Sequence, residues 1–508
     1  MINLEEINLE EINILTDDKK IALIGALFDY AHEEQNLKAI ELGFKISELI
    51  DIEQLNDENN ITLHYFLANG YNCLRDLKHK NTKKIWDFQL DESVKEIFHL
   101  RKAISNISFQ KIEKQRQCQI YTNLGNCFNF IGRFIEAQQY WNKAVEISPD
   151  FAMGIGNRAN GLYNYGSYLF DDFHKNLLNI FAFHDLNSAL LLKEFLYPEA
   201  ESQMQKLYLY LKQYIPDEYQ IKLPDLNSYD LGKDKILVEY RKWCLKNVLF
   251  INPLNDLGNY NIASHDSLNM PTLTLKWSKP PIYVNLFNQI KQEFGTARFS
   301  YFNSLQSNNP HFSDIDINII ETMESAQYSY YLEQLKISFR LSYSILDKIA
   351  FLLNDYLKLG MKEFDVNFNS IWYADRDKKK LNEFFVNSKN WALKGLYWLS
   401  KDLYEKKGDW DDILEPEAKE IKKIRNSIEH RGLKVLLECV THYDKDEEIS
   451  YTIERLDFEA KTMKMLKLTR SAIMYLSLAI HQEESTKEVS DSIKIPVDYG
   501  LVPDFMRI

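Results

Sequence analysis

The chain has 508 residues, of which 45% are hydrophobic, so it is long enough for about three domains with sizeable cores. Glycine and proline are scarce, at 17 and 12 residues, which favours helices over a turn-rich β protein. The formal net charge of −13 excludes a generic nucleic-acid coat protein, because such a protein would be basic. Any contact with RNA must therefore come from a local positive patch.

The cysteines and the apolar segments of the sequence indicate the cellular compartment in which the protein is expected. The acidic N-terminus lacks the positive and apolar regions of a signal peptide, and no apolar run approaches the ~20 residues of a membrane span. We expect a soluble, cytoplasmic protein that does not contact a membrane. The cysteines are odd in number, form no C-x-x-C pair and indicate reduced thiols rather than a disulfide framework or a zinc site. They are Cys73, Cys118, Cys127, Cys244 and Cys439.

A helical repeat pattern is strongest over residues 118–151. Gly125 and Ala137 would let two antiparallel helices approach closely, aromatic side chains would fill the groove between them, and Pro149 would end the second helix. The pattern resembles a tetratricopeptide (TPR) repeat, whose small and large positions are occupied in order. These positions are Tyr121, Leu124, Gly125, Phe128, Gly132, Ala137, Trp141, Ala144 and Pro149.

Weaker copies of the pattern flank this segment. Residues 64–71 would form the first helix of a repeat with a partner near 96–104, residues 152–162 would begin the next repeat, and 23–46 is a further candidate. Because one repeat cannot bury its own apolar face, about three or more are expected. We therefore predict an irregular TPR-like helical solenoid over residues 1–215.

A connecting segment is predicted over residues 216–320. Pro216 and Pro224 lie in turn-forming sequence. Residues 272–276 and 281–284 have the composition of short strands or extended segments, and the two prolines at 280 and 281 argue against a helix there. The segment is expected to be irregular.

From residue 321 the sequence becomes strongly helical. Further helices are predicted over 390–404, about 415–431 and 457–479, with Pro416 in the first turn of the second of these and Gly432 as its C-terminal cap. We predict a bundle of four or five helices over 321–485, then a loop-like tail over 486–508. The fold class is mainly all-α. The first bundle helix has an apolar face formed by Leu335, Phe339, Leu346, Ile349 and Leu353.

The helix predicted over 415–431 contains the string R-N-S-I-E-H at residues 425–430. Arg425 keeps its charge and can clamp an anion, while the imidazole of His430 can move a proton, so the two suit chemistry on a phosphodiester. They lie about 140° apart around an ideal helix and do not meet on one straight helix. A site that uses both needs the arginine to swing round, a distorted last turn, or a second copy of the helix.

An ordinary amphipathic helix is the alternative interpretation of the same residues. Arg425 and Glu429 would then form a surface ion pair, and His430 would be a solvated side chain near a helix end. In either case the buried stripe of the helix is expected to consist of Ile421, Ile424 and Ile428.

The string resembles the R-x4-6-H motif of the HEPN (higher eukaryotes and prokaryotes nucleotide-binding) superfamily, in which a polar residue, here Asn426, often follows the arginine. The predicted bundle, with the motif in a late helix, is similar to that family as well. Residues 243–257, WCLKNVLFINPLNDL, resemble a bacterial branch in which TPR-like repeats precede a C-terminal HEPN domain. The resemblance covers roughly residues 236–479.

The resemblance implies a metal-independent endoribonuclease, a toxin or effector of prokaryotic antiviral defence, abortive infection or stress response. It would act as a homodimer through the C-terminal bundle, with two motif helices in one composite site. Arg425 would hold the scissile phosphate and the charge of its transition state, His430 would be the general acid or base, and Asn426 would orient it or bind phosphate. Attack by an RNA 2′-hydroxyl needs an acid–base group and a cation, so no metal or cofactor is expected.

RNA would need positive charge near this motif. Lys422, Lys423 and Arg431 would supply the local RNA-binding patch that the global charge withholds. The TPR-like half is expected to sense a trigger or to bind a protein or peptide partner.

Other candidate sites are less specific. Asp347 and Lys348 lie in the first bundle helix, where some HEPN members carry a polar residue that reaches the site, although such a pair usually marks a solvated helix edge. Asn252, Asn255 and Asp256 resemble the pattern of the bacterial branch, and turn chemistry is the alternative explanation for them. The pair at 265–266, His-Asp, has no third partner in sequence. The string H-E-x-x-H, a Walker loop and G-x-S-x-G do not occur, which disfavours metal-dependent hydrolysis, NTP hydrolysis and serine chemistry.

Two further functions stay open. One is a non-catalytic TPR and HEPN scaffold for protein interaction or nucleotide binding, which the acidic balance favours. The other is a TPR-type transcription regulator, for which the N-terminus offers no helix-turn-helix candidate.

Overall fold

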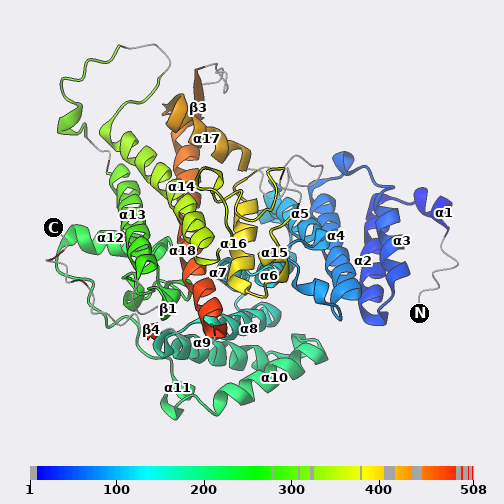
Figure 1. Cartoon of the computed structure of the whole chain (residues 1–508). Coiled ribbons are helices and arrows are strands. Elements are labelled where there is room, and N and C mark those ends of the chain that lie inside the picture. The colour runs from blue at the N-terminus through cyan, green and yellow to red at the C-terminus, as the bar shows by residue number, and fades with distance from the viewer. Residues whose placement is uncertain are drawn as a thin grey trace. The chain divides into compact units, whose positions relative to one another are not determined.

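The structure is a computed structural model that describes residues 8–275, 280–306, 309–320, 325–377, 380–404, 418–437, 449–487 and 493–495, with Val502 and Met506 (Figure 1). The described chain is mainly helical, which confirms the predicted fold class. It divides into two compact units. Unit 1 contains Met1–Tyr165 and Asn179–Leu223, and unit 2 contains Gly166–Leu178, Pro224–Glu405 and Glu417–Ile508, as far as these ranges are described. The domain limits expected from the sequence stay a prediction.

Unit 1 is built from helices that pack in sequential pairs. The pairs are α2 with α3, α4 with α5, and α6 with α7, and contacts of α2 with α4 and of α5 with α6 join one pair to the next. This is the TPR-like solenoid that the sequence predicts, and the weak copies near 64–71 and 96–104 fall within α4 and α5. The helices before Leu223 are α1 (Leu9–Asn13), α2 (Asp17–Glu34), α3 (Leu37–Ser47), α4 (Asp57–His79), α5 (Asp91–Ser105), α6 (Lys114–Phe130), α7 (Phe134–Ile147), α8 (Ala152–Tyr168), α9 (Asp172–Leu191), α10 (Pro198–Lys212) and α11 (Asp217–Ile221). The end of α8 and the start of α9 belong to unit 2.

The close approach of α6 and α7 has the cause that the repeat pattern predicts. A Cβ atom on Gly125 would lie 2.5 Å from Nε1 of Trp141, so only glycine leaves room for the indole. The same indole nitrogen donates a hydrogen bond of 3.0 Å to Asn126 Oδ1. Gly132 makes the turn between the helices at a φ of 85°, a conformation that a side chain disfavours.

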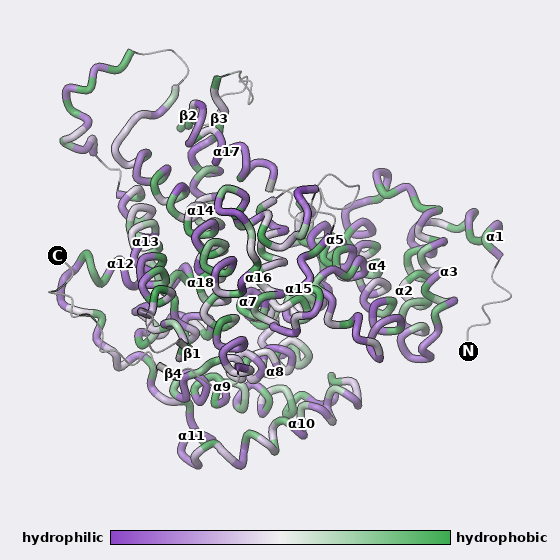
Figure 2. Tube along the Cα trace, in the orientation of Figure 1, coloured by the Kyte–Doolittle hydropathy of each residue, from purple (hydrophilic) through white to green (hydrophobic). Residues whose placement is uncertain are grey.

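Unit 2 is organised around its last helix. The 32-residue helix α18 (Arg455–Thr486) packs against α13 (Ile282–Ser304), α14 (Tyr330–Tyr356) and α16 (Trp391–Lys401), and the first two run beside it in Figure 1. Hydrophobic and hydrophilic residues alternate along these helices in Figure 2, as expected where one face is buried. The remaining elements are α12 (Lys235–Lys246), α15 (Glu383–Asn387), α17 (Ala418–His430), β1 (Leu273–Leu275), β2 (Gly432–Leu436), β3 (Ser450–Glu454) and β4 (Ile493–Ile495).

A buried arginine anchors the segment after α12 to the rest of unit 2. Arg470 of α18 donates to the carbonyl oxygens of Phe250 (2.6 Å) and Asn252 (3.0 Å) and to Asp256 Oδ1 (2.8 Å). The Arg470 and Asp256 side chains are 1% and 0% exposed. Asn255, which is also buried, donates to the carbonyl oxygen of Leu245. The asparagines and the aspartate of the N-P-L-N-D string therefore hold the fold together.

A helix replaces the extended segment that we expected at 281–284. Helix α13 begins at Ile282, and Pro281 is its N-cap. The prediction was wrong because a proline blocks a helix only where its missing N–H and its ring interfere with a preceding turn, and at a helix start neither matters. The expected strand at 272–276 is confirmed as β1.

Two further predictions near the C-terminus were wrong. Gly432 does not cap α17 in a left-handed conformation, because it is the first residue of β2, which pairs in parallel with β3, and its N–H donates to Ile449 O at 2.8 Å. The tail is not wholly loop-like, since β4 pairs antiparallel with β1. Both strands depend on partners outside their own segment, which a local pattern does not reveal.

The other helix predictions hold with small shifts. Asn390 is the N-cap of α16, where its side chain accepts from Leu393 N at 3.1 Å, and α18 extends the helix expected at 457–479 in both directions. Pro416 and Cys439 lie outside the described residues. Within the described chain no helix is both long and apolar enough to cross a membrane. The four described cysteines are buried and unpaired: Cys73, Cys118, Cys127 and Cys244.

Candidate functional site

Helix α17 carries the R-N-S-I-E-H string and is fixed from its apolar side. Ile421 and Ile424 are 0% exposed, as predicted, whereas Ile428 is only partly buried. Glu420 adds a polar attachment, because its carboxylate lies 2.9 Å from Lys461 Nζ of α18 and accepts from the Tyr451 hydroxyl at 2.8 Å. These contacts attach the first half of α17 to α18 and β3, and the helix also packs against α14.

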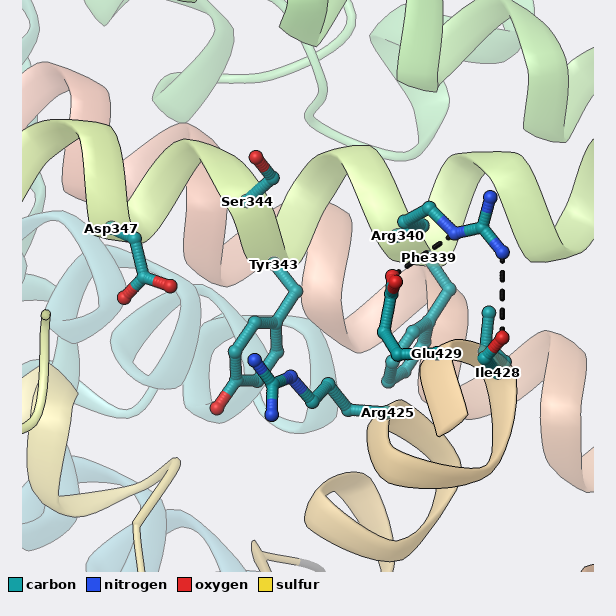
Figure 3. A pocket seen from close by; sticks show the side chains of 8 residues that line it. All are labelled: Phe339, Arg340, Tyr343, Ser344, Asp347, Arg425, Ile428 and Glu429. Atoms are coloured by element: carbon teal, nitrogen blue, oxygen red, sulfur yellow. Dashed lines mark hydrogen bonds and ion pairs between the residues drawn. The ribbon is translucent and has the colours of Figure 1, made fainter. Parts of the chain in front are cut away.

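A pocket of about 170 Å³ lies between α14 and α17 (Figure 3). Helix α14 supplies the residues of one wall and α17 those of the other, so the pocket is formed wholly within unit 2. Its lining contains two arginines, two carboxylates and one tyrosine beside apolar and hydroxyl groups. The lining residues are Phe339, Arg340, Tyr343, Ser344, Asp347, Arg425, Ile428 and Glu429.

Arg425 of the motif points into this pocket. Its guanidinium carbon lies 5.3 Å from the ring centroid of Tyr343, within the range of a cation–π contact. Its Nη1 donates a hydrogen bond of 3.2 Å to Oδ1 of Asn426, the next residue of the motif. Asn426 is therefore placed beside the arginine, and Figure 3 shows the guanidinium in front of the Tyr343 ring. A half-buried guanidinium with a free approach from the pocket can bind an anion.

Asp347 is brought to the same pocket, although its position in the sequence suggested a solvated helix edge. Burial raises the pKa of its carboxyl above the ordinary value, while a hydrogen bond from Phe368 N (3.0 Å) and the charge of Arg425 act in the opposite direction. Lys348 points elsewhere and pairs with Glu293 of α13. The pocket thus places a carboxyl with a raised pKa near the motif arginine.

The phenol of Tyr343, which lines the pocket beside Arg425, is neutral at physiological pH. Burial raises the pKa of Tyr343 to about 12, although a hydrogen bond from Tyr404 and the charge of Arg425 lower it. Burial also raises the pKa of Tyr404 well above its ordinary value. The Tyr343 hydroxyl can therefore donate a hydrogen bond in the pocket but does not act as a base near neutral pH.

His430 does not line this pocket. It is the last residue of α17 and is exposed. A separation of about 140° between Arg425 and His430 on an ideal helix agrees with this placement. One chain therefore brings Arg425, Asn426 and Asp347 together and leaves His430 on the surface of the same helix.

The three basic residues expected to contact RNA are exposed at the surface of the motif region. Lys422 and Lys423 lie on α17, and Arg431 follows it directly. Lys423 Nζ lies 5.7 Å from the ring centroid of Tyr451. Their exposure is compatible with the predicted patch, and their role stays a prediction.

Glu429 pairs with Arg340 of α14, whereas the amphipathic-helix interpretation paired it with Arg425. The Arg340 Nε and Glu429 Oε1 atoms lie 3.0 Å apart, and Arg340 Nη2 donates to Ile428 O at 3.4 Å. Sequence reasoning missed Arg340. The available signal was a polar stripe at positions 340, 344 and 347, which lie three or four residues apart on one face of the helix.

Residues 274–483 match the model of the LA2681-like HEPN family. This segment is a HEPN domain. The match spans α13 to α18, so it includes the motif helix and the whole pocket, and it confirms the resemblance found in residues 425–430. No curated protein and no solved structure matches the chain. HEPN domains are often RNases, and the family suggests an RNase or a nucleotide-related effector.

Outside the HEPN motif, the remaining sequence candidates are structural. Asp266 forms an ion pair of 2.9 Å with the buried Arg298 and accepts from Ile251 N at 2.7 Å. The ring of His265 stacks on Tyr229 with a centroid distance of 5.5 Å. Among the described residues no group of three or more His, Cys, Asp or Glu side chains is placed to hold a metal ion.

Proposed function

We propose that the protein is a metal-independent endoribonuclease, a HEPN effector or toxin of prokaryotic defence or stress response. The observation that carries the proposal is the placement of Arg425, the motif arginine, in a pocket of the HEPN domain that also holds Asp347 and a second arginine. A guanidinium in this position can hold a phosphodiester and stabilise the negative charge that develops in the transition state.

The reaction needs two proton transfers and involves no oxidation or reduction. The 2′-oxygen of a ribose attacks the adjacent phosphorus and loses its proton to a base, the bond from phosphorus to the 5′-oxygen breaks, and that oxygen gains a proton from an acid. The products are a 2′,3′-cyclic phosphate and a 5′-hydroxyl. In the proposal His430 carries one of these protons, Arg425 binds the phosphate, and Asn426 holds Arg425.

His430 takes part only if a second copy of the chain supplies it. Since His430 is exposed and lies outside the pocket of Arg425, one chain leaves the two groups in separate places. A homodimer in which two α17 helices face each other would bring the Arg425 of one copy to the His430 of the other. In this proposal Lys422, Lys423 and Arg431 guide RNA to the dimer, and the TPR-like unit binds the trigger or a protein partner.

The test measures cleavage of single-stranded RNA in EDTA. We expect cleavage by the wild type and a loss of about 100-fold or more in Arg425→Ala and in His430→Ala, because each removes a group that acts in the transition state. Arg376→Ala is a matched control, since Arg376 also pairs with a carboxylate, at 3.2 Å from Asp365, but does not line the pocket. Cleavage that persists in both motif variants, or that requires magnesium, would contradict the proposal.

Mixing the two inactive variants tests the composite site. In a mixed dimer of Arg425→Ala and His430→Ala, one of the two sites contains both native residues, so random exchange of an equal mixture restores about one quarter of the wild-type activity. A site formed within one chain would stay inactive in every dimer. Sequencing of RNA ends after induction of the wild type and of His430→Ala would then reveal the substrate.

A non-catalytic HEPN and TPR scaffold is the second candidate. The exposed position of His430 outside the pocket and the net charge of −13 favour it. This function requires binding without cleavage. A wild-type protein that binds nucleotide or a protein partner but leaves RNA intact would support it.

A further inference from the structure

The ion pair of Arg340 and Glu429 links the two walls of the HEPN pocket. Arg340 comes from α14 and Glu429 from α17, and their charged groups meet at 3.0 Å (Figure 3). The side chains are 50% and 35% exposed, so water reaches both partners. Arg340 Nη2 also donates to Ile428 O at 3.4 Å, which directs the guanidinium toward the end of α17.

An ion pair with this exposure is easily exchanged. Surface pairs contribute little to stability, because water and salt compete for both charges and the side chains lose freedom when they pair. A phosphate presents the same kind of charged oxygens to a guanidinium as a carboxylate does. The Glu429 carboxylate therefore occupies a place on Arg340 that a phosphate oxygen can take.

The charges of the pocket show why this exchange matters. Arg340 and Arg425 line the same cavity of about 170 Å³, and so do the carboxyl groups of Asp347 and Glu429. While Glu429 remains on Arg340, one of the two positive charges is neutralised at the place where an anion would bind. Movement of the Glu429 side chain into solvent would leave both guanidinium groups available to one phosphodiester.

We propose that Arg340 is a second phosphate-binding residue of the RNA site and that Glu429 occupies it until RNA displaces the carboxylate. The proposal rests on the ribonuclease function proposed above and adds a residue that lies outside the motif. It makes RNA binding a competition between a phosphate and a carboxylate of the motif helix. Removal of the carboxylate therefore strengthens binding, and removal of the arginine weakens it.

The test measures the affinity of the full chain for a single-stranded 2′-O-methyl RNA oligonucleotide by fluorescence anisotropy. This RNA cannot be cleaved through its 2′-oxygens, so binding is separated from chemistry. We expect Arg340→Ala to weaken binding by about tenfold, as for the loss of a charged hydrogen bond. The slope of log K against log salt should fall by roughly 0.7 for one phosphate contact to a single strand.

Glu429→Gln should bind the same oligonucleotide roughly two- to fivefold more tightly, because an exposed ion pair no longer competes. The double variant decides between competition and a general charge effect. If Glu429 acts through Arg340, then Glu429→Gln has no effect on affinity in the Arg340→Ala background. Arg376→Ala, which removes an arginine–carboxylate pair outside the pocket, should bind like the wild type.

Three results would overturn the inference and leave the proposed function standing, provided that RNA cleavage still depends on Arg425 and His430. They are an unchanged affinity in Arg340→Ala, an equal loss in Arg376→Ala, and a gain from Glu429→Gln that persists without Arg340. A wild-type protein that neither binds the oligonucleotide nor cleaves unmodified RNA would overturn this inference and the proposed function together.

Discussion

The centre of α18 and the pocket beside α17 place arginines of the same HEPN domain in opposite environments. Arg470 is 1% exposed and directs its guanidinium nitrogens at a carboxylate and two carbonyl oxygens. Arg340 is 50% exposed and meets one carboxylate and, at 3.4 Å, one carbonyl oxygen. A buried guanidinium whose three nitrogens each donate a hydrogen bond belongs to the fold, since moving it would leave buried polar groups without partners. A half-exposed guanidinium can exchange its partner for a substrate.

The largest expected effect is on the buried side of this comparison. Arg470→Met should lower the free energy of unfolding by about 3–5 kcal/mol, because it removes the cation from the buried carboxylate of Asp256. Urea unfolding, together with hydrogen exchange of peptides from α18, would measure the loss. Peptides from α6 and α7 in unit 1 serve as the internal control.

A second variant keeps this prediction interpretable. Arg470→Met combined with Asp256→Leu removes both charges and should recover part of the lost stability, because the desolvated carboxylate is gone. If the free energy of unfolding of Arg470→Met falls by less than about 1 kcal/mol, the buried arginine stabilises the fold no more than a surface arginine does, and the comparison fails.

An intermediate effect is expected at Asp347, which lies between the two extremes of exposure. Burial raises its pKa above the ordinary value of 3.8, so the folded protein binds this proton more tightly than the unfolded chain does. The stability that the protonated Asp347 carboxyl contributes to the folded protein is present at low pH and is lost as the pH rises through the raised pKa. Asp347→Asn stays neutral, so its melting temperature relative to the wild type should increase between pH 4 and pH 7.

Paired thermal scans across this pH range would measure the difference. The two proteins should converge toward the acidic end, where both side chains are neutral. A constant difference would show that the attraction of Arg425 for an ionised Asp347 balances burial, and a difference that decreases toward pH 7 would show that the attraction outweighs burial.

The smallest effect is expected on the exposed side. Arg340→Ala should change the free energy of unfolding by less than about 1 kcal/mol, because a half-exposed ion pair contributes little. The urea experiment used for Arg470→Met measures it under the same conditions. A loss comparable to that of Arg470→Met would mean that Arg340 holds α14 and α17 together, and it would weaken the case for exchange with a phosphate.

Local patterns were sufficient for much of the fold. The apolar face from Leu335 to Leu353 predicted α14, because a helix repeats its face every three or four residues and needs no information from elsewhere. The glycine and tryptophan at 125 and 141 predicted a close helix pair for the same reason, since they belong to one compact repeat. The string at 425–430 predicted the HEPN domain that the family match confirms.

The errors arose where a residue's role depends on a distant partner. Pro280 and Pro281 argued against a helix in the local sequence. A helix, α13, nevertheless begins directly after them and packs against α14 and α18. Gly432 looked like a helix cap until pairing with a segment near residue 450 made it a strand residue. In both cases the local sequence was compatible with more than one structure.

The sequence by itself determined the helical class, the repeat solenoid and the motif, because each depends on residues within one or two turns or within one repeat. Only the tertiary structure decided which groups share the pocket. Arg340 and Ile428 are 88 residues apart, and the packing of α17 on α14 alone brings Arg340, Asp347 and Arg425 to one cavity while it leaves His430 outside. Contacts between distant helices are set by the way their apolar faces pack, and no periodicity within either helix encodes that arrangement.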